Sequence, residues 1–333
     1  MAQVTEQPGQ VTARFRRDVL PGLPAATSGH LIFVKALLAV LALAVLLTGP
    51  PEFAGDAGLA EHWLTGREVD VTMRSAAVGG EVTTRLLLPP DWSREATRTW
   101  PVLYLLHGSG DDHAAWTDHT DVATLNIGAI VVMPDGGHCG NYSDWWNQGR
   151  GGAPAWETFH LTELRRILET RYHAGDRRAV AGNSMGGMGA MHYAAAHPDL
   201  FQAAAAYSGA VDPLSYPDAT ESMWLLCPGS DWHNLWGDPA RPNEVGMWRE
   251  HSVRDVSGLR GKALFLSCGD GDEIEHVVRG ESQALVDRLH AAAVPVTTEF
   301  YAGGRHAWPD WQRELHRSLP MLLAAIGAGR MGR

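Results

Sequence analysis

The stretch Gly182-Asn183-Ser184-Met185-Gly186 lies between the short apolar run Ala179–Ala181 and an alanine-rich segment. It is a G-x-S-x-G pattern. With a strand before it and a helix after it, such a pattern is typical of a nucleophile elbow, where the serine occupies a strained turn. The flanking glycines let the turn be tight, and the following helix supplies partial positive charge from its N-terminus. The stretch therefore predicts that Ser184 is a catalytic nucleophile, and an ordinary glycine-rich turn is the alternative.

Strand-like and helix-like runs alternate on both sides of this stretch. Two opening strands, Val69–Met73 and Val82–Leu88, are expected to pair antiparallel through Gly79-Gly80. A helix is expected from about Trp156 to Tyr172, because its leucines fall on one face. Further strand-like runs lie at 102–106, 129–133, 179–181, 203–207, 264–267 and 297–301. The alternation predicts an α/β fold with a mostly parallel central sheet flanked by helices.

Two later loops carry the residues that would complete a catalytic triad. His306 lies in a glycine-rich loop after the last expected strand and is the predicted general base. The loop after 264–267 holds three acids, of which Asp272 is favoured, Glu273 second and Asp270 third, as the carboxylate that orients the histidine. A solvated turn acid is the alternative for each of them. The order serine, acid, histidine is that of the α/β-hydrolase fold.

The oxyanion hole is expected to consist of two backbone N–H groups. One belongs to Met185, which follows the predicted nucleophile, and the other to Ser109, which follows His107-Gly108 at the end of an expected strand. Such donors stabilise the charge of a tetrahedral intermediate by ~3–4 kcal/mol each.

Composition excludes several classes of protein. The 333 residues include 45% apolar and 20% charged residues, which is typical of a chain with a globular core. The net charge of -11 argues against nucleic-acid binding, since an acidic surface repels phosphates. The sequence contains no P-loop, no HExxH and no dinucleotide-binding fingerprint.

No cofactor and no metal ion are expected. The three cysteines do not form a CxxC pattern, and His160 with Glu163 shares a helix face without a third ligand. If the protein is exported, a Cys139–Cys227 disulfide is one prediction, and three buried free thiols are the alternative.

The N-terminal region predicts membrane targeting. Residues 1–30 form a basic N-terminal region with Arg14, Arg16 and Arg17, and 31–49 are apolar apart from Lys35. This pattern is typical of a signal peptide or a transmembrane segment, and cleavage is left open. A linker is expected at 50–61 and the catalytic domain at 62–328. The domain is therefore expected outside the cytoplasm, secreted or anchored to the membrane through the N-terminal segment alone.

Several longer motifs carry a family resemblance. They are Val131-Val132-Met133-Pro134 with Gly136-Gly137, Tyr142-Ser143-Asp144-Trp145, Trp156-Glu157-Thr158-Phe159 with Glu163-Leu164, Leu235-Trp236-Gly237 and His306-Ala307-Trp308. From about Val69 to Leu323 the chain resembles the esterase family of α/β-hydrolases that includes esterase D and the secreted antigen 85 mycolyltransferases. The resemblance implies a triad of Ser184, an acid and His306, with Ser109 and Met185 as oxyanion donors.

Departures from the family pattern bear on the acid and on the substrate. The mycolyltransferases use a glutamate in a longer loop, whereas esterase D-like relatives place an aspartate three residues after the loop glycine, as Gly269 and Asp272 do here. The disulfide-bearing loop of the family is replaced by 147–153, which holds no cysteine. The loop His107–Asp111 lacks the arginine that the mycolyltransferases place beside their sugar site. Trehalose and mycolate are therefore not implied as substrates.

The sequence thus predicts an exported serine esterase that forms an acyl-enzyme on a small-molecule, lipid or sugar ester. An acyltransferase that passes the acyl group to a sugar or glyceride is the first alternative. A non-catalytic cell-surface binding protein is the second.

Overall fold

The computed structural model describes residues 58–224, 227 and 232–329. The chain divides into two units, Met1–Gly55 and Asp56–Arg333. The predicted signal or transmembrane segment at 31–49 falls in the first unit and lies outside the described residues. Among the residues that are described, no helix combines the length and the apolar character needed to cross a membrane.

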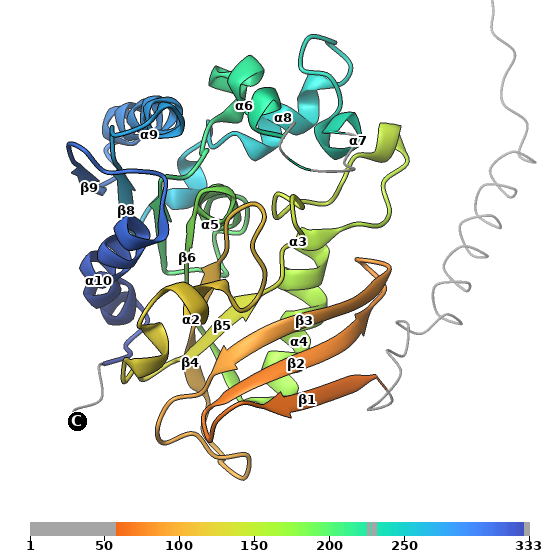
Figure 1. Ribbon diagram of the computed structural model, residues 1–333, viewed down its shortest axis with the longest axis vertical. Helices are drawn as coiled ribbons and strands as arrows, with labels where there is room; N and C mark the ends of the chain where they lie inside the picture. Colours follow the sequence, from red (N-terminus) through yellow and green to blue (C-terminus); the bar gives the residue numbers. More distant parts are fainter. Residues whose placement is uncertain (1–57, 225–226, 228–231, 330–333) are drawn as a thin grey trace, which may run out of the picture. The chain divides into compact units, whose positions relative to one another are not determined.

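The described part of the second unit is built on one mixed sheet of nine strands (Figure 1). Its order is β1-β2-β3-β5-β4-β6-β7-β8-β9. The first three strands and the β3–β5 pair are antiparallel, and every pair from β5 through β4 to β9 is parallel. The strands are β1 Leu59–Trp63, β2 Glu68–Ser75, β3 Gly80–Leu87, β4 Trp100–Leu106, β5 Ile130–Pro134, β6 Ala174–Asn183, β7 Ala203–Tyr207, β8 Ala263–Cys268 and β9 Thr297–Phe300.

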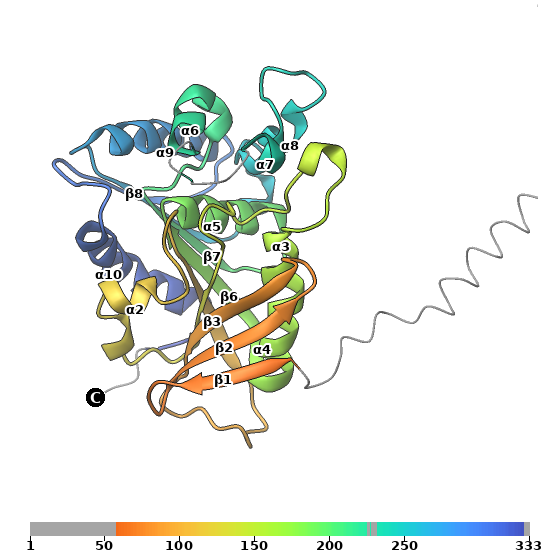
Figure 2. The same cartoon turned by 45° about the vertical axis from the view of Figure 1, so that its right-hand side comes forward.

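Helices cover both faces of this sheet (Figure 2). One face packs against α4, α5 and α9, and the opposite face packs against α2 and α10. The helical elements around the sheet are α2 Ala115–His119, α3 Trp156–Thr158, the π-helical turn η3 Phe159–Leu164, α4 Arg165–Arg171, α5 Met185–Ala196, α9 Glu273–Ala291 and α10 Trp308–Ala325. Short 3-10 turns are η1 Val122–Thr124, η2 Asn147–Gly149, η4 Pro213–Ser215 and η5 Ser257–Leu259.

Side chains of the central strands alternate between two apolar cores. In β4, Val102, Tyr104 and Leu106 enter the core beneath α5, while Leu103 and Leu105 enter the core beneath α10. Because both faces are covered, these strands contain continuous apolar runs, which are the property that identified them in the sequence. The predicted α/β fold with a mostly parallel sheet flanked by helices is confirmed.

Two details differ from the sequence-based expectation. β1 begins at Leu59, inside the segment 50–61 that was predicted as a linker, and it pairs along β2. Four of its five residues are exposed, so it shows no alternating pattern that would indicate a strand. The helix expected from about Trp156 to Tyr172 forms over Trp156–Arg171, with η3 as a π-helical insertion.

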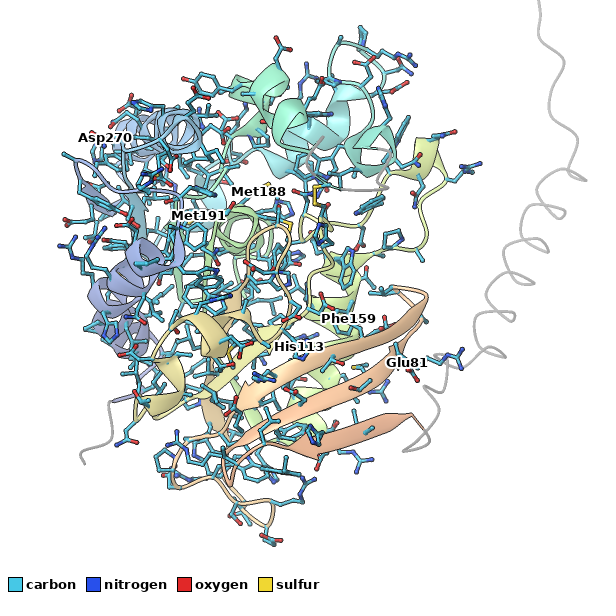
Figure 3. All side chains as sticks on the ribbon, in the orientation of Figure 1. Glu81, His113, Phe159, Met188, Met191 and Asp270 are labelled. Atoms are coloured by element: carbon cyan, nitrogen blue, oxygen red, sulfur yellow. A yellow bond between two sulfur atoms is a disulfide. The ribbon has the colours of Figure 1, made fainter. Side chains whose placement is uncertain are left out.

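A segment of short helices follows β7 and leads to β8. It contains α6 Pro217–Trp224, α7 Trp232–Trp236 and α8 Val245–His251. An apolar cluster of Leu235, Trp236, Val245 and Trp248 joins α7 and α8 to Met188 on α5. Figure 3 labels Met188. We call residues 212–252 the cap segment.

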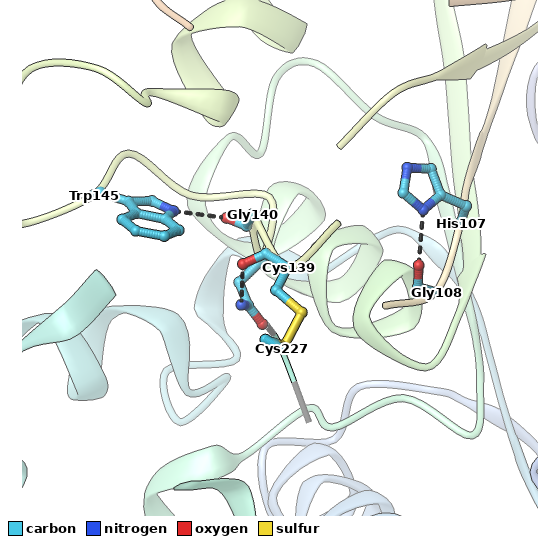
Figure 4. Close-up of a disulfide and its surroundings, with 7 residues drawn as sticks. His107, Gly108, Cys139, Gly140, Trp145 and Cys227 are labelled. Atoms are coloured by element: carbon cyan, nitrogen blue, oxygen red, sulfur yellow. Dashed lines mark hydrogen bonds between the residues drawn. A yellow bond between two sulfur atoms is a disulfide. The ribbon is translucent and has the colours of Figure 1, made fainter. Parts of the chain in front are cut away.

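A disulfide joins Cys139 to Cys227, with 6.0 Å between the two Cα atoms (Figure 4). Cys139 belongs to the loop after β5, and Cys227 belongs to the cap segment. The pairing predicted for these two cysteines is confirmed, and Cys268 remains a buried free thiol.

Loss of this disulfide is expected to destabilise the fold. The bond closes a loop of 88 residues, and the chain-entropy model assigns such a cross-link about 4–5 kcal/mol. A Cys227→Ser variant should therefore melt about 10 °C below the wild type in calorimetry. Addition of a reductant should lower the melting temperature of the wild type and leave that of the variant unchanged. Equal melting temperatures for both proteins would contradict this expectation.

Candidate active site

Ser184 occupies a strained turn between β6 and α5. Its φ is +51° and its ψ is -121°, a backbone conformation that side-chain-bearing residues rarely adopt. A Cβ atom placed on Gly182 would lie 2.4 Å from the backbone of Gly186, and one on Gly186 would lie 2.2 Å from the carbonyl oxygen of Leu106. Both glycines of the pattern are therefore required by close backbone contact. The N–H of Ser184 donates to the carbonyl of Tyr207 at 2.9 Å and fixes the turn to β7.

The structure brings Ser184 and His306 together. The Oγ of Ser184 lies 2.8 Å from the Nε2 of His306. The Nδ1 of the same imidazole lies 2.8 Å from the Oε1 of Glu275, whose side chain is fully buried. Trp311 packs edge-on against the imidazole, with 5.0 Å between ring centroids. A serine, a histidine and a carboxylate are thus linked in the order that acyl-transfer catalysis uses.

The carboxylate that contacts the histidine is that of Glu275, and the choice of Asp272 was wrong on this point. Asp272 is the N-cap of α9, and its Oδ1 accepts from the N–H of Glu275 at 2.9 Å. Its Oδ2 accepts from the backbone N–H of His306, also at 2.9 Å. Although burial favours the neutral form, these two hydrogen bonds hold the pKa of Asp272 below its usual range. Both oxygens are engaged with the backbone, so Asp272 positions His306 without meeting its ring.

The other two candidate acids do not contact the imidazole either. Glu273 is exposed in the first turn of α9. Asp270 accepts from the N–H of Gly303 at 2.6 Å, near the start of α9 (Figure 3). The loops that carry Asp270 and His306 approach closely, because the N–H of Gly271 donates to the carbonyl of Gly304 at 2.7 Å.

Sequence reasoning missed Glu275, although a signal was present. Asp272 and Glu275 have the spacing of an N-cap residue and the third residue of its helix, which is a capping signature. That signature assigns Asp272 to capping of the helix backbone. It places Glu275 in the first turn of α9, where its side chain is buried. The Oε2 of Glu275 accepts from the N–H of Gly269 at 2.6 Å, which leaves Oε1 for His306.

The loop after β4 is held by a buried histidine. The N–H of Gly136 donates to the Nε2 of His107 at 2.9 Å, so the ring proton lies on Nδ1 and is donated to the carbonyl of Gly108 at 2.8 Å (Figure 4). A trans peptide points its N–H away from its carbonyl. The His107–Gly108 contact therefore fixes the direction of the Ser109 N–H.

The surroundings of Ser109 and Met185 suit them as backbone donors. A Cβ on Gly108 would lie 3.4 Å from the Cβ of Ser184, so the loop that leads to Ser109 lies against the candidate nucleophile. The N–H of Gly110 donates to the carbonyl of His138 at 2.8 Å and secures the other side of the loop. Met185 is the first residue of α5, where a backbone N–H has no carbonyl within the helix to bind.

His160 and Glu163, which share a helix face, have packing roles. His160 bonds to the hydroxyl of Tyr193 and the carbonyl of Asp135, and burial lowers its pKa to about 4. Glu163 accepts from the hydroxyl of Ser75 and from the N–H of Ala77.

Comparison with known proteins shows the family to which the chain belongs. The family model described as "Putative esterase" matches residues 75–322. The chain belongs to this esterase family. It is 32% identical over 262 residues to Esterase Rv1288 of Mycobacterium tuberculosis, an alignment that covers 72% of this chain and 56% of that protein. The chain thus spans little more than half the length of that relative.

A second relative is similar over almost its whole length. The diacylglycerol acyltransferase/mycolyltransferase Ag85B of Mycobacterium avium is 29% identical over 340 residues, which cover 90% of this chain and 96% of that protein. The crystal structure of MPT51 of Mycobacterium tuberculosis superposes with a TM-score of 0.65 at 23% identity, over 77% of this chain and 97% of that one. The family resemblance and the α/β-hydrolase fold are confirmed. The expected enzyme class, a serine hydrolase or an acyltransferase, is confirmed at that level.

Substitution of the candidate acids is expected to separate their roles. Glu275→Gln should lower kcat for ester hydrolysis by about 10⁴-fold, because an amide neither fixes the imidazole tautomer nor stabilises the imidazolium. Asp272→Asn keeps an effective N-cap, and its loss of kcat should be at least about 100-fold smaller than that of Glu275→Gln. Glu273→Gln, on the exposed side of the same turn, is the matched control and should behave as wild type. A larger loss of kcat in Asp272→Asn than in Glu275→Gln would assign the role of the acid that orients His306 to Asp272.

Proposed function

We propose that this protein is a serine esterase that works through an acyl-enzyme on Ser184. The observation that carries the proposal is the continuous hydrogen-bonded line from Ser184 Oγ through His306 to Glu275. Its two distances of 2.8 Å lie within the range in which a base takes a proton from a nucleophile.

The same geometry supports a direction for each proton. The carboxylate of Glu275 accepts a hydrogen bond from Nδ1 of His306, so Nδ1 carries the ring proton. The Nε2 of His306 therefore presents a lone pair to the hydroxyl of Ser184. As Ser184 attacks the ester carbonyl, His306 takes the hydroxyl proton and the buried carboxylate of Glu275 stabilises the resulting imidazolium. The N–H groups of Ser109 and Met185 are the proposed donors to the oxyanion. His306 then returns the proton to the leaving alcohol.

The second half of the reaction needs an acceptor for the acyl group. If the acceptor is water, His306 removes a proton from it as its oxygen attacks the acyl carbon. The bond from the acyl carbon to Ser184 Oγ then breaks, His306 returns the proton to Ser184 Oγ, and the carboxylic acid leaves. If the acceptor is the hydroxyl of a sugar or glyceride, the same steps make the chain an acyltransferase. The similarity to Ag85B over nearly the full length of both chains favours keeping this second candidate. We place the esterase first because Esterase Rv1288 has the higher identity and the family model is that of esterases.

A non-catalytic binding protein fits the site less well. A binding role on this fold does not require a serine, a histidine and a buried carboxylate to be aligned within hydrogen-bond distance. It also does not require a strained serine, since strain of this kind is retained where function uses it.

We further propose that the catalytic unit works outside the cytoplasm. The basic and apolar pattern of residues 14–49 supports export. The Cys139–Cys227 disulfide gives independent support, because such bonds persist in oxidising compartments.

The decisive test is turnover of p-nitrophenyl esters of increasing acyl length by the wild type and by Ser184→Ala. Removal of the hydroxyl should lower kcat at least about 10⁴-fold, since only the contributions of binding and of the oxyanion hole remain. Ser93→Ala, at a surface serine between β3 and β4, is the control and should retain full activity. A rapid burst of nitrophenol followed by slow turnover, relieved by an added sugar or glycerol, would favour the acyltransferase. Equal inactivity of wild type and variant on every ester would reject both catalytic proposals.

A further inference from the structure

A second cluster of polar side chains lies beside the helix that carries the nucleophile, on residues that the proposed reaction does not use. Glu157 belongs to α3, His192 to α5 and His251 to the last position of α8. Each offers a ligating atom, and these atoms all lie within 4.8 Å of one another. Three separate segments of the chain thus converge on one point.

Hydrogen bonds already join part of this cluster. The Nε2 of His192 lies 2.9 Å from one carboxylate oxygen of Glu157. The Nε2 of His197, just beyond the end of α5, lies 2.6 Å from the other oxygen. The carboxylate of Glu157 therefore lies between two imidazoles.

His251 has the orientation of a metal ligand. Its Nδ1 donates to the carbonyl of Met247 at 2.9 Å, so the lone pair of the neutral ring lies on Nε2. Metal-bound histidines commonly have their second nitrogen held by a carbonyl in this way. The ring of His251 stacks against that of His192, with 4.5 Å between centroids.

We propose that Glu157, His192 and His251 form a zinc site, with a water molecule as the fourth ligand. Two imidazoles and one carboxylate are a donor set that Zn²⁺ takes, together with a solvent molecule, in tetrahedral geometry. Ligand atoms at the usual bond lengths from zinc are about 3.3 Å apart, a separation between the 2.9 Å hydrogen bond of His192 to Glu157 and the 4.8 Å limit of the cluster. With zinc bound, His192 carries its ring proton on Nδ1 and binds the ion through the lone pair of Nε2.

The site would join the cap segment to the catalytic body. His251 ends α8 in the cap segment, and His192 lies on α5, eight positions after Ser184 or about 12 Å along the helix axis. At that distance the ion does not touch the reacting atoms. Zinc is therefore expected to raise the stability of the fold, with little effect on the ester-cleaving step.

The sequence predicted no metal because no local motif encodes this site. The ligands at 157, 192 and 251 come from regions that only the fold brings together.

Zinc binding can be measured directly on the full chain without an affinity tag. After treatment with a chelator, titration with zinc chloride should show one tight site per chain by calorimetry and by metal analysis. Zinc at a hundredfold excess over its Kd should raise the melting temperature by about 5 °C. His192→Gln and His251→Gln should each abolish this rise. His62→Gln and His290→Gln, at exposed histidines, should retain it.

Two further measurements keep the result interpretable. The melting curve of each variant without zinc shows that it is folded, and Glu157→Gln replaces either histidine variant that is not. His306→Ala should bind zinc as the wild type does, which separates this site from the candidate active site. The proposal is overturned if no tight site is found, if folded His192→Gln and His251→Gln bind like the wild type, or if His306→Ala loses binding. None of these readouts depends on esterase activity, so the proposed function and the zinc site can fail independently.

Discussion

The contact between α5 and the end of β4 sets the geometry on which the candidate site depends. Gly186 approaches the carbonyl oxygen of Leu106 so closely that a methyl group would lie 2.2 Å from it. Only without side chains at Gly182 and Gly186 can the helix begin directly beneath the strand ends. This contact brings the N-terminus of α5, the strained Ser184 and the loop from His107 to Gly110 to one edge of the sheet. The hydrolytic chemistry proposed here requires all three at that edge.

A similar constraint acts where the histidine and acid loops meet. A Cβ on Gly269 would lie 2.1 Å from the carbonyl oxygen of Gly304, so the two loops pack backbone against backbone. Asp272 joins them by accepting one N–H from α9 and one from His306. Glu275 is left as the acid that reaches the imidazole, from within a helix. A helix is a rigid support, and rigid support of the proposed triad acid favours a fixed imidazole orientation.

The features that the sequence predicted are encoded by neighbouring residues, and the features that it missed depend on contacts between distant residues. The tight turn at Ser184 and the parallel strands were predictable because a short motif and continuous apolar runs encode them. The acid that contacts His306 was not, because three carboxylates crowd one loop and the choice between them depends on the position of His306, more than thirty residues later. β1 was missed because it is mostly exposed and is defined by its pairing with β2. The ligands of the proposed zinc site are the extreme case, since only the tertiary fold brings them together.

In the proposed reaction, the choice between water and an alcohol as acyl acceptor cannot lie in the proposed triad, which performs the same proton transfers in both cases. It must lie in the parts of the chain that admit an acceptor and exclude water. The Cys139–Cys227 disulfide connects the cap segment to the loop after β5. Cys139 follows His138, whose carbonyl holds the N–H of Gly110 in the loop that carries Ser109, and Cys227 belongs to the cap segment. The cap segment and the proposed oxyanion loop are therefore mechanically linked in this chain.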